Sequence, residues 1–332
     1  MKWILASIIL LTGCSRYADF TLPVLEGQPG TVAYHWDVFP TPILMRGAAG
    51  SWDSVDALNP SVVVLQQGKL LNVYSGYDGK TWHSGIAESS DSITWTKKGK
   101  ILSPDPSTWE GDYIAANGSA IYESGKFLYW YQAARMPQIG LATSSDAKVW
   151  KKNGEPVLAR GPRGSWDEMG AADPYAIRVA DHLYMYYLGQ DRARRQRLGV
   201  ARSRDGVTWE KYRSNPILEL GAHGRFDDTG LGEPAVWSQH GWYWMLYTAR
   251  NQKEERRLGL ARSRNGVGWT RVTEEAVLSG ALDWNSKVIC DPHVLANTNP
   301  LWVYFGGGNR AEPAENLNGQ IGYATLKLSL MP

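Results

Sequence analysis

Cysteine is nearly absent from this sequence, which has only Cys14 and Cys290 in 332 residues. An N-terminal signal described below accounts for Cys14, so Cys290 is the only thiol left in the mature chain. A fold held by intramolecular disulfides is therefore excluded. A chain of roughly 300 ordered residues buries about three quarters of its unfolded surface, so we expect a hydrophobic core to hold it.

Several functional signatures are missing as well. The sequence has no basic run and a formal net charge of only +2, which argues against nucleic acid as a partner. No spacing of His, Cys and acidic residues is typical of a zinc site, and neither a glycine-rich phosphate loop nor a serine nucleophile elbow is present. No segment keeps a helical period. We expect no organic cofactor and a monomeric protein.

The first residues resemble a bacterial lipoprotein signal. Met1-Lys2 is a minimal positive start, and the apolar stretch from Trp3 to Leu11 is too short to span a membrane. Leu11-Thr12-Gly13-Cys14 then resembles a lipobox. This resemblance implies a signal peptide at 1–13, a diacylglycerol and palmitate on Cys14, a tether at 14–33, and a lipid-anchored protein of the bacterial cell envelope, at the outer membrane or cell surface. The alternative is an ordinary cleaved secretion signal with a chance cysteine.

One stretch, clearest from Gly164 to Tyr187, returns along almost the whole remaining sequence. Each copy has a polar marker residue, usually followed by proline, ahead of an apolar strand. The five markers are Asn59, Asn117, Asp173, Glu233 and Asp291. They are separated by 58, 56, 60 and 58 residues, a period that is typical of an array or a propeller.

Each copy predicts four short antiparallel strands. In the third copy, polar turns at 180–182 and 204–206 separate apolar or aromatic segments, and Asp-Gly and Asn-Gly turns supply the positive φ that tight hairpins need. Five such units predict an all-β fold, a five-bladed β-propeller over residues 34–332. Because the last copy ends without its final strand, we expect the N-terminal strand Trp36 to Leu44 to complete the last blade and close the ring.

The variable loops are expected on one face of the ring. If each marker opens the innermost strand of its blade, the long loops and the inter-blade linkers share the face of the markers, where a binding site is expected. The substrate-binding candidates there are Asn59, Asn117, Asp112, Arg135, Asp191, Arg250, Arg310 and His293. Arginines on the loops 190–197 and 250–257 favour an anionic glycan or phosphate. The alternative is a solvated rim.

Three of the markers are acids. Asp173, Glu233 and Asp291 are expected to converge at the axis, where like charges raise one another's pKa. Carboxyl groups with separated pKa values are what glycoside cleavage uses, one as general acid and one acting at the anomeric carbon. The alternative is that these acids only form turns before proline.

With these motifs the chain resembles the five-bladed propeller glycosidases of families 43 and 32, over about residues 36–330. In those families three inner-strand acids are a base or nucleophile, an Asp that tunes pKa or binds sugar, and a Glu general acid. The resemblance implies that Asp173 is the second of these and Glu233 the third. The first acid, the base or nucleophile, would fall at the position of Asn117, but a neutral amide cannot act as a base. The alternatives for the base are therefore Asp112, Asp56 and Asp291.

The resemblance implies a glycoside hydrolase that acts on poly- or oligosaccharide at the cell surface and serves carbohydrate metabolism. A non-catalytic carbohydrate-binding lipoprotein is the rival. A more distant resemblance to the family 130 phosphorylases adds a glycoside phosphorylase as a further alternative. Some family 43 members hold a calcium-type ion beneath the pocket, near the position of His293, although a structural histidine is the alternative. Tryptophans with acidic neighbours, such as Trp52-Asp53 and Trp166-Asp167, are expected to be structural, and the tryptophans that end each copy are expected in the core.

Overall fold

The computed structural model describes residues 16–331 and confirms the all-β prediction. Its helical content is two single 3-10 turns, η1 (Gln66–Gly68) and η2 (Asp283–Asn285). Within residues 16–331, no helix has the length and apolar character that a membrane crossing requires. The expected signal peptide and Cys14 lie outside the described residues.

Antiparallel pairing groups the strands in fours, in the order that each repeat predicts. The first two runs are β3 (Asp56–Val64), β4 (Leu70–Tyr77), β5 (Trp82–Ser89), β6 (Thr96–Leu102) and β7 (Ala115–Glu123), β8 (Lys126–Ala133), β9 (Gln138–Ser144), β10 (Lys151–Lys152). The next two are β11 (Gly170–Val179), β12 (His182–Gln190), β13 (Gln196–Ser203), β14 (Glu210–Tyr212) and β15 (Gly230–Gln239), β16 (Trp242–Arg250), β17 (Arg256–Ser263), β18 (Trp269–Arg271).

The last run takes its fourth strand from the N-terminal part of the chain. It contains β19 (Val288–Leu295), β20 (Leu301–Gly308) and β21 (Gln320–Leu330). Strand β2 (Val32–Val38) then pairs antiparallel with β21, from Val32 opposite Leu330 to Val38 opposite Ala324. This strand begins and ends earlier than the expected Trp36 to Leu44, and Leu44 forms only an isolated bridge to Ile321.

The segment expected as a tether packs against the sheets over its described part. Strand β1 (Arg16–Ala18) pairs parallel with β14. Phe20 and Leu22 are buried, and the backbone N–H of Leu22 donates to the carbonyl of Asn265 at 2.8 Å. The segment from β1 to Leu22 is therefore not a free tether, because the side chains of Phe20 and Leu22 pack in the core. The role of 14–33 as a spacer from a membrane stays a prediction.

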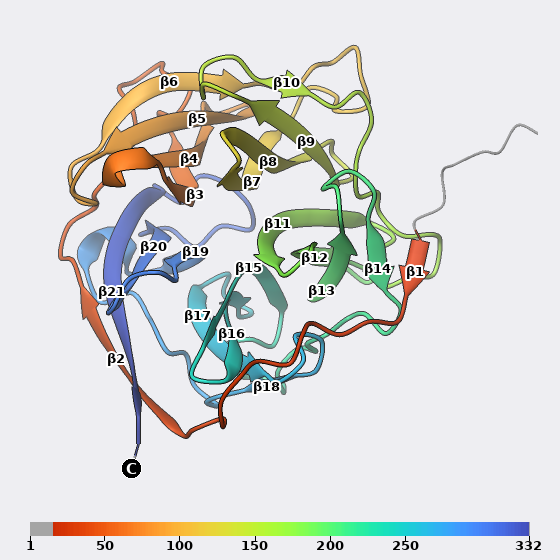
Figure 1. The fold of residues 1–332 in the computed structure, drawn as a ribbon. Helices are drawn as coiled ribbons and strands as arrows, with labels where there is room; N and C mark the ends of the chain where they lie inside the picture. Colours follow the sequence, from red (N-terminus) through yellow and green to blue (C-terminus); the bar gives the residue numbers. More distant parts are fainter. Residues whose placement is uncertain (1–15, 332) are drawn as a thin grey trace, which may run out of the picture.

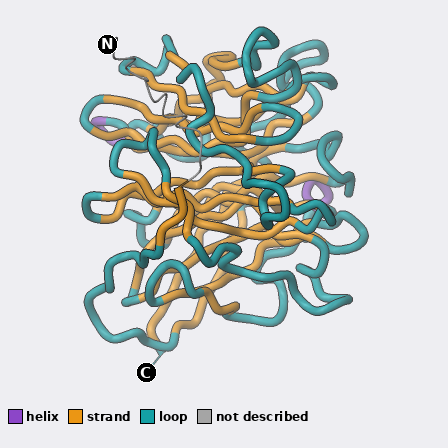
Figure 2. Tube along the Cα trace, turned by 90° about the vertical axis from the view of Figure 1, so that its right-hand side faces the viewer, coloured by secondary structure: helices purple, strands orange, loops and turns teal. Residues whose placement is uncertain are grey.

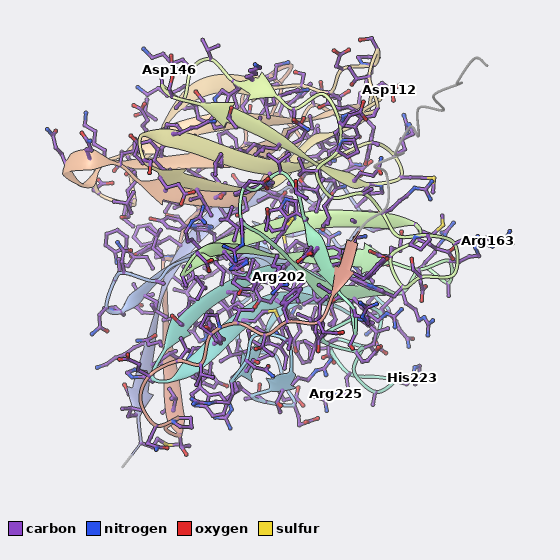
Figure 3. The ribbon with its side chains drawn as sticks, turned by 45° about the vertical axis from the view of Figure 1, so that its right-hand side comes forward. Asp112, Asp146, Arg163, Arg202, His223 and Arg225 are labelled. Carbon is purple, nitrogen blue, oxygen red and sulfur yellow. The ribbon has the colours of Figure 1, made fainter. Side chains whose placement is uncertain are left out.

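The first strands of the five runs lie next to one another. β3 contacts β7, β7 contacts β11, β11 contacts β15, β15 contacts β19, and β19 contacts β3. Figure 1 shows the groups of strands around a common centre, and Figure 2 shows loops gathered at both ends of the strands. Figure 3 shows Asp112, Arg163 and His223, from three different linkers, on one side of the molecule, and Asp146 of a tight turn on the other. This agrees with the expected separation of linkers and turns.

Aromatic side chains fill the space between neighbouring runs. The ring of Trp209 packs edge-on against Trp130 of the preceding run, with the centroids 5.8 Å apart. Trp269 contacts Tyr186 in the same way, also at 5.8 Å, and Trp95 contacts Tyr304 at 5.9 Å. The predicted core role of the tryptophans that end each copy is thus confirmed for these three.

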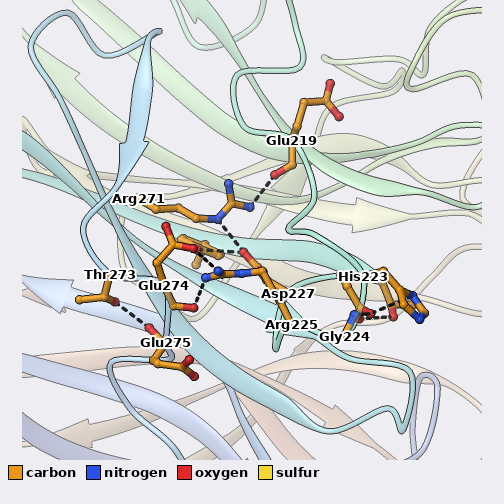
Figure 4. Close-up of polar contacts among 12 residues, drawn as sticks. Glu219, His223, Gly224, Arg225, Asp227, Arg271, Thr273, Glu274 and Glu275 are labelled. Atoms are coloured by element: carbon orange, nitrogen blue, oxygen red, sulfur yellow. Dashed lines mark hydrogen bonds and ion pairs between the residues drawn. The ribbon is translucent and has the colours of Figure 1, made fainter.

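A buried ion pair recurs in four of the runs. An acid in the linker that enters the run pairs with a cation on the last strand of the same run, and it accepts a hydrogen bond from a tyrosine on the second strand. The pairs are Asp53–Lys97, Glu110–Lys152 and Asp167–Lys211, each at 2.5 Å, and Asp227–Arg271 at 2.6 Å, with Tyr74, Tyr131, Tyr187 and Tyr247 as the donors. Figure 4 shows the fourth pair, in which Arg271 also donates to the Glu219 carbonyl.

The expected structural role of the linker acids is therefore confirmed, with a lysine or arginine as their main partner. In the last run, Asn285 occupies the repeat position of the acid, and Phe305 occupies that of the tyrosine. Three linker tryptophans, Trp52, Trp166 and Trp284, cover glycines of the second and third strands of their runs. A Cβ at Gly189 would lie 2.2 Å from the ring of Trp166, and one at Gly199 would lie 2.5 Å from it.

Candidate functional site

Each marker lies at a bulge in the first strand of its run. The strand register shifts at all five positions, and the markers adopt positive φ values: 49° at Asn59, 51° at Asn117, 46° at Asp173, 39° at Glu233 and 51° at Asp291. The markers therefore lie within the strands, three or four residues from the start, and the expectation that they open the strands is wrong. The left-handed conformation costs most for Glu233, since Asn and Asp tolerate it better. Such strain, about 1–3 kcal/mol per residue, is concentrated at functional sites in proteins.

The bulges bring all five markers to one pocket. The pocket has a volume of about 170 Å³, and Asn59, Asn117, Asp173, Glu233 and Asp291 all line it. A smaller hollow of about 30 Å³ is lined by the same side chains, the residues that follow them, and His293. The expected convergence of residues from five distant parts of the sequence is therefore observed.

Burial and mutual repulsion keep protons on the acids of this pocket. Burial, followed by the charges of Glu233 and Asp291, raises the pKa of Asp173 well above its usual range. Burial, followed by the charge of Glu233, raises the pKa of Asp291 to about 7. The protonated forms of Asp173 and Asp291 are therefore favoured in this pocket.

Two arginines lie beside these acids. Arg250 lines the pocket, and its charge opposes the rise in the pKa of Asp173. Arg256 is also at the pocket, is only 4% exposed, and opposes the rise in the pKa of Asp291. The position of Arg250 at the site was predicted from the sequence, whereas Arg256 was expected only as part of an arginine-rich rim.

Hydrogen bonds hold the markers in place. Asp291 accepts at Oδ2 from the backbone N–H of Asn59 at 3.2 Å and from the thiol of Cys290 at 3.1 Å. The N–H of Asp291 donates to Thr248 Oγ1 at 3.0 Å, and the N–H of Asn117 donates to Ser75 Oγ at 2.8 Å. The thiol of Cys290 is buried, and burial raises its pKa, so it acts here as a donor in its neutral form.

Four predicted substrate-binding residues line neither the pocket nor the smaller hollow. Asp112 and Arg135 form a solvent-exposed ion pair at 3.3 Å. Asp191 is buried and accepts from Arg195 and Arg197, which fixes the turn of its own loop. Arg310 is exposed, and its backbone N–H donates to the carbonyl of Leu317.

The alternative base Asp56 has a structural position. It is fully buried, and its carboxylate accepts hydrogen bonds from the backbone N–H groups of Asn316 and Gly319, both at 2.7 Å. It anchors the loop between β20 and β21 and does not line the pocket. Of the three alternatives for the base, only Asp291 lies in the pocket.

His293 has the contacts of a structural histidine. Its Nε2 is 2.8 Å from the carbonyl oxygen of Val62, its ring packs against Tyr175 and Tyr304, and burial lowers its pKa to about 4. Within residues 16–331, no group of three or more His, Cys, Asp or Glu side chains is placed to hold a metal ion. A calcium-type ion beside His293 has no such ligand set there.

Several lining residues were not identified from the sequence. Trp82 and Tyr113 form an aromatic wall, and Glu315 comes from the loop between β20 and β21. Gln132, Gln190 and Gln196 add amide groups. A signal was available for Trp82, which begins β5 directly after the loop 78–81. No local pattern distinguishes Glu315 from the neighbouring Glu312.

The pocket has what acid-assisted cleavage of a polar ligand requires. It holds carboxyl groups that keep protons near neutral pH, a second carboxylate in contact with the same space, and cations that balance part of the charge. An aromatic wall beside hydrogen-bonding groups suits a sugar ring, which has an apolar face and a polar edge.

Comparisons with known proteins agree with this chemistry. The sequence profile described as "Glycosyl hydrolases family 32 N-terminal domain" matches residues 70–219 and again residues 140–279. The starts of the two matches are 70 residues apart and the ends 60, close to the repeat spacing. Two Mycobacterium tuberculosis proteins, the uncharacterized Rv1502 and MT1551, are each 25% identical over 230 residues, which covers 66% of this chain and 73% of theirs.

Solved structures of glycoside hydrolases share the fold. One described as "Glycoside hydrolase" has a TM-score of 0.70 at 17% identity, covering 86% of this chain and 91% of the other. A thermostable family-43 glycoside hydrolase has a TM-score of 0.62 at 17% identity, covering 87% and 91%. A structure from the GH130 family of mannoside phosphorylases, described with hydrolases that target β-1,2 mannosidic linkages in Candida mannan, has a TM-score of 0.68 at 16% identity, covering 94% and 99%. At these identities the likeness shows the fold. Because the family 32 profile covers more than half of the chain, the protein belongs to the glycosyl hydrolases family 32 N-terminal domain family.

Proposed function

We propose that this protein hydrolyses glycosidic bonds in a poly- or oligosaccharide. The observation that carries the proposal is the pocket itself, where three carboxyl groups converge and two of them have raised pKa values. Glycoside hydrolysis needs a proton donor for the leaving oxygen and a carboxylate at the anomeric side. A pocket in which one carboxyl group keeps its proton beside another that is ionised can supply both.

We assign the roles by position. Glu233 is the general acid, Asp173 is the neighbour that keeps a proton close to Glu233, and Asp291 acts at the anomeric side, either on water or directly. Asp291 is chosen because Asp56 is engaged by backbone N–H groups and Asp112 is outside the pocket. Arg256 favours the ionised form of Asp291 that this role requires.

A glycan panel, assayed with and without inorganic phosphate, tests this proposal. We expect wild-type turnover on at least one glycan, with loss of turnover but retained binding in Glu233→Gln. The matched control is Glu312→Gln, an exposed glutamate on the loop between β20 and β21. Turnover that survives in Glu233→Gln would remove the acid role. Turnover that requires phosphate would replace hydrolysis by phosphorolysis.

One observation favours a second candidate, carbohydrate binding without cleavage. Asn59 and Asn117 place neutral amides at two of the five markers, where an acid would otherwise be available as a base. In that case the panel would give binding to the wild type and no turnover. The same measurement therefore separates the two candidates.

We also propose that the five runs of strands are five blades of a propeller, with β2 closing the last blade. The successive contacts of the first strands, including β19 with β3, support this arrangement. An experimental structure that counts another number of blades would contradict it.

We further propose that the mature protein is a monomer held on the bacterial envelope by a lipid on Cys14. The lipobox-like Leu11-Thr12-Gly13-Cys14 supports the lipid. Labelling with a palmitate analogue should mark the wild type and leave Cys14→Ser unlabelled. Equal labelling of both would refute the site.

A further inference from the structure

The loop 309–319, between β20 and β21, forms one wall of the pocket through Pro313, Ala314 and Glu315. Buried charges hold this loop. The Asp56 carboxylate accepts from two of its backbone N–H groups, and Arg256 donates to the carbonyls of Glu312 at 3.1 Å and Pro313 at 3.0 Å. The position of Glu315 is therefore fixed before any ligand binds.

Two phenols orient the Glu315 carboxylate. Tyr113 donates to Oε2 at 2.9 Å, and Tyr77 donates to Oε1 at 3.4 Å. Burial, followed by the charge of Glu315, raises the pKa of Tyr77 to about 12 and that of Tyr113 further, so both phenols stay protonated as donors. Each carboxylate oxygen can accept one more hydrogen bond.

The rest of the pocket presents further acceptors to a ligand. Among the described residues, Asn117 Oδ1 and Gln132 Oε1 are buried without a hydrogen-bond partner. Both oxygens can therefore accept a hydrogen bond from a ligand. Of the two guanidinium groups, Arg256 donates to two backbone carbonyls and keeps a buried Nε without a partner within residues 16–331, and Arg250 forms an ion pair with Glu254 at 3.4 Å. An anionic ligand would face carboxylates, whereas hydroxyl groups would satisfy the acceptors.

We propose that Glu315 is the specificity-determining residue of this pocket, which binds an uncharged sugar unit through two neighbouring hydroxyls and rejects one that carries a carboxylate or phosphate. The ring of Trp82, which stacks on Tyr77 with the centroids 4.9 Å apart, provides a flat wall for the apolar face of the sugar. Two of the exposed arginines of the rim are already paired with acids, Arg192 with Glu168 and Arg195 with Asp191. The proposal rests on the proposed function only in taking the ligand to be a glycan.

Calorimetric titration with neutral disaccharides, their C6-oxidised uronates and inorganic phosphate tests the proposal. We expect the wild type to bind at least one neutral sugar, and to bind its uronate at least about 10-fold more weakly. Glu315→Gln should weaken binding of the neutral sugar by about 10- to 100-fold, which is the effect of losing hydrogen bonds to a charged group. Tyr113→Phe should weaken it by a smaller factor, and the exposed Glu312→Gln should leave it unchanged.

The outcomes separate this inference from the hydrolase proposal. If neutral sugars bind through Glu315 but no glycan is cleaved, the inference stands and hydrolysis fails. If cleavage occurs, Glu315→Gln should raise KM and leave kcat within a few-fold. The proposal is overturned if no neutral sugar binds, if uronate or phosphate binds equally well, if Glu315→Gln binds like the wild type, or if it loses kcat at constant KM.

Discussion

The buried pair Asp167–Lys211 offers a sharp test of how the runs are held together. Both side chains are fully buried, and Nζ lies 2.5 Å from the carboxylate and 2.7 Å from the Ala159 carbonyl oxygen. Lys211→Met removes the cation and leaves the carboxylate buried with only the neutral hydroxyls of Tyr187 and Ser165 as polar side-chain partners. Removing one member of a buried pair costs about 3–5 kcal/mol.

The matched control is an exposed pair with similar geometry. Arg204 and Asp181 are 2.6 Å apart, but their side chains are 71% and 62% exposed. Arg204→Met should therefore cost less than about 1 kcal/mol. Urea unfolding followed by tryptophan fluorescence compares the two variants directly. Equal destabilisation of Lys211→Met and Arg204→Met would refute the structural role of the buried pair.

Three further predictions concern stability. Because the pKa of Asp291 is raised to about 7 in the fold, its protonated form is favoured by folding, and its contribution to stability is lost as pH rises from about 4 to 7. The wild-type Tm should therefore fall relative to that of Asp291→Asn over this range, and parallel profiles would contradict the pKa shift. Gly189→Ala would place a Cβ 2.2 Å from a tryptophan ring and should lower the free energy of unfolding in urea by about 1–3 kcal/mol. The same change at Gly154, which has no atom near its Cβ position, should leave stability nearly unchanged. Equal destabilisation of the two variants would refute the close contact. Leu22→Ala should lower the free energy of unfolding by about 2–4 kcal/mol, because this side chain is only 1% exposed. Val24→Ala, at a side chain that is 79% exposed, should have little effect. Unchanged stability of Leu22→Ala would contradict the packing of this segment and support a free tether.

The repeat predicted most of the strand order. The spacing of the markers and the turns such as Asp205-Gly206 are local signals, and they identified the hairpins of each copy correctly. The bulges were not predictable, because the left-handed conformation of Glu233 depends on the neighbouring strands rather than on its own preference. The marker was therefore placed at the start of the strand instead of within it.

The site residues at the repeated marker positions were predicted from the sequence, and those contributed by other segments were missed. Asp173, Glu233 and Asp291 share the marker position, so the expected symmetry brought them together. Glu315 reaches the pocket only because Asp56, more than two hundred residues away in the sequence, fixes the loop that carries it. Long-range contacts of this kind leave no local pattern in a single sequence.

The most direct test of the central claim is the turnover of a cleavable glycan by wild type and Glu233→Gln, with binding measured in parallel. The account predicts a fall in kcat of about 10²- to 10⁴-fold, the usual contribution of a general acid, with a Kd that stays within a few-fold. Equal kcat in the two proteins would contradict the assignment of Glu233 and, with it, the proposed chemistry of the pocket.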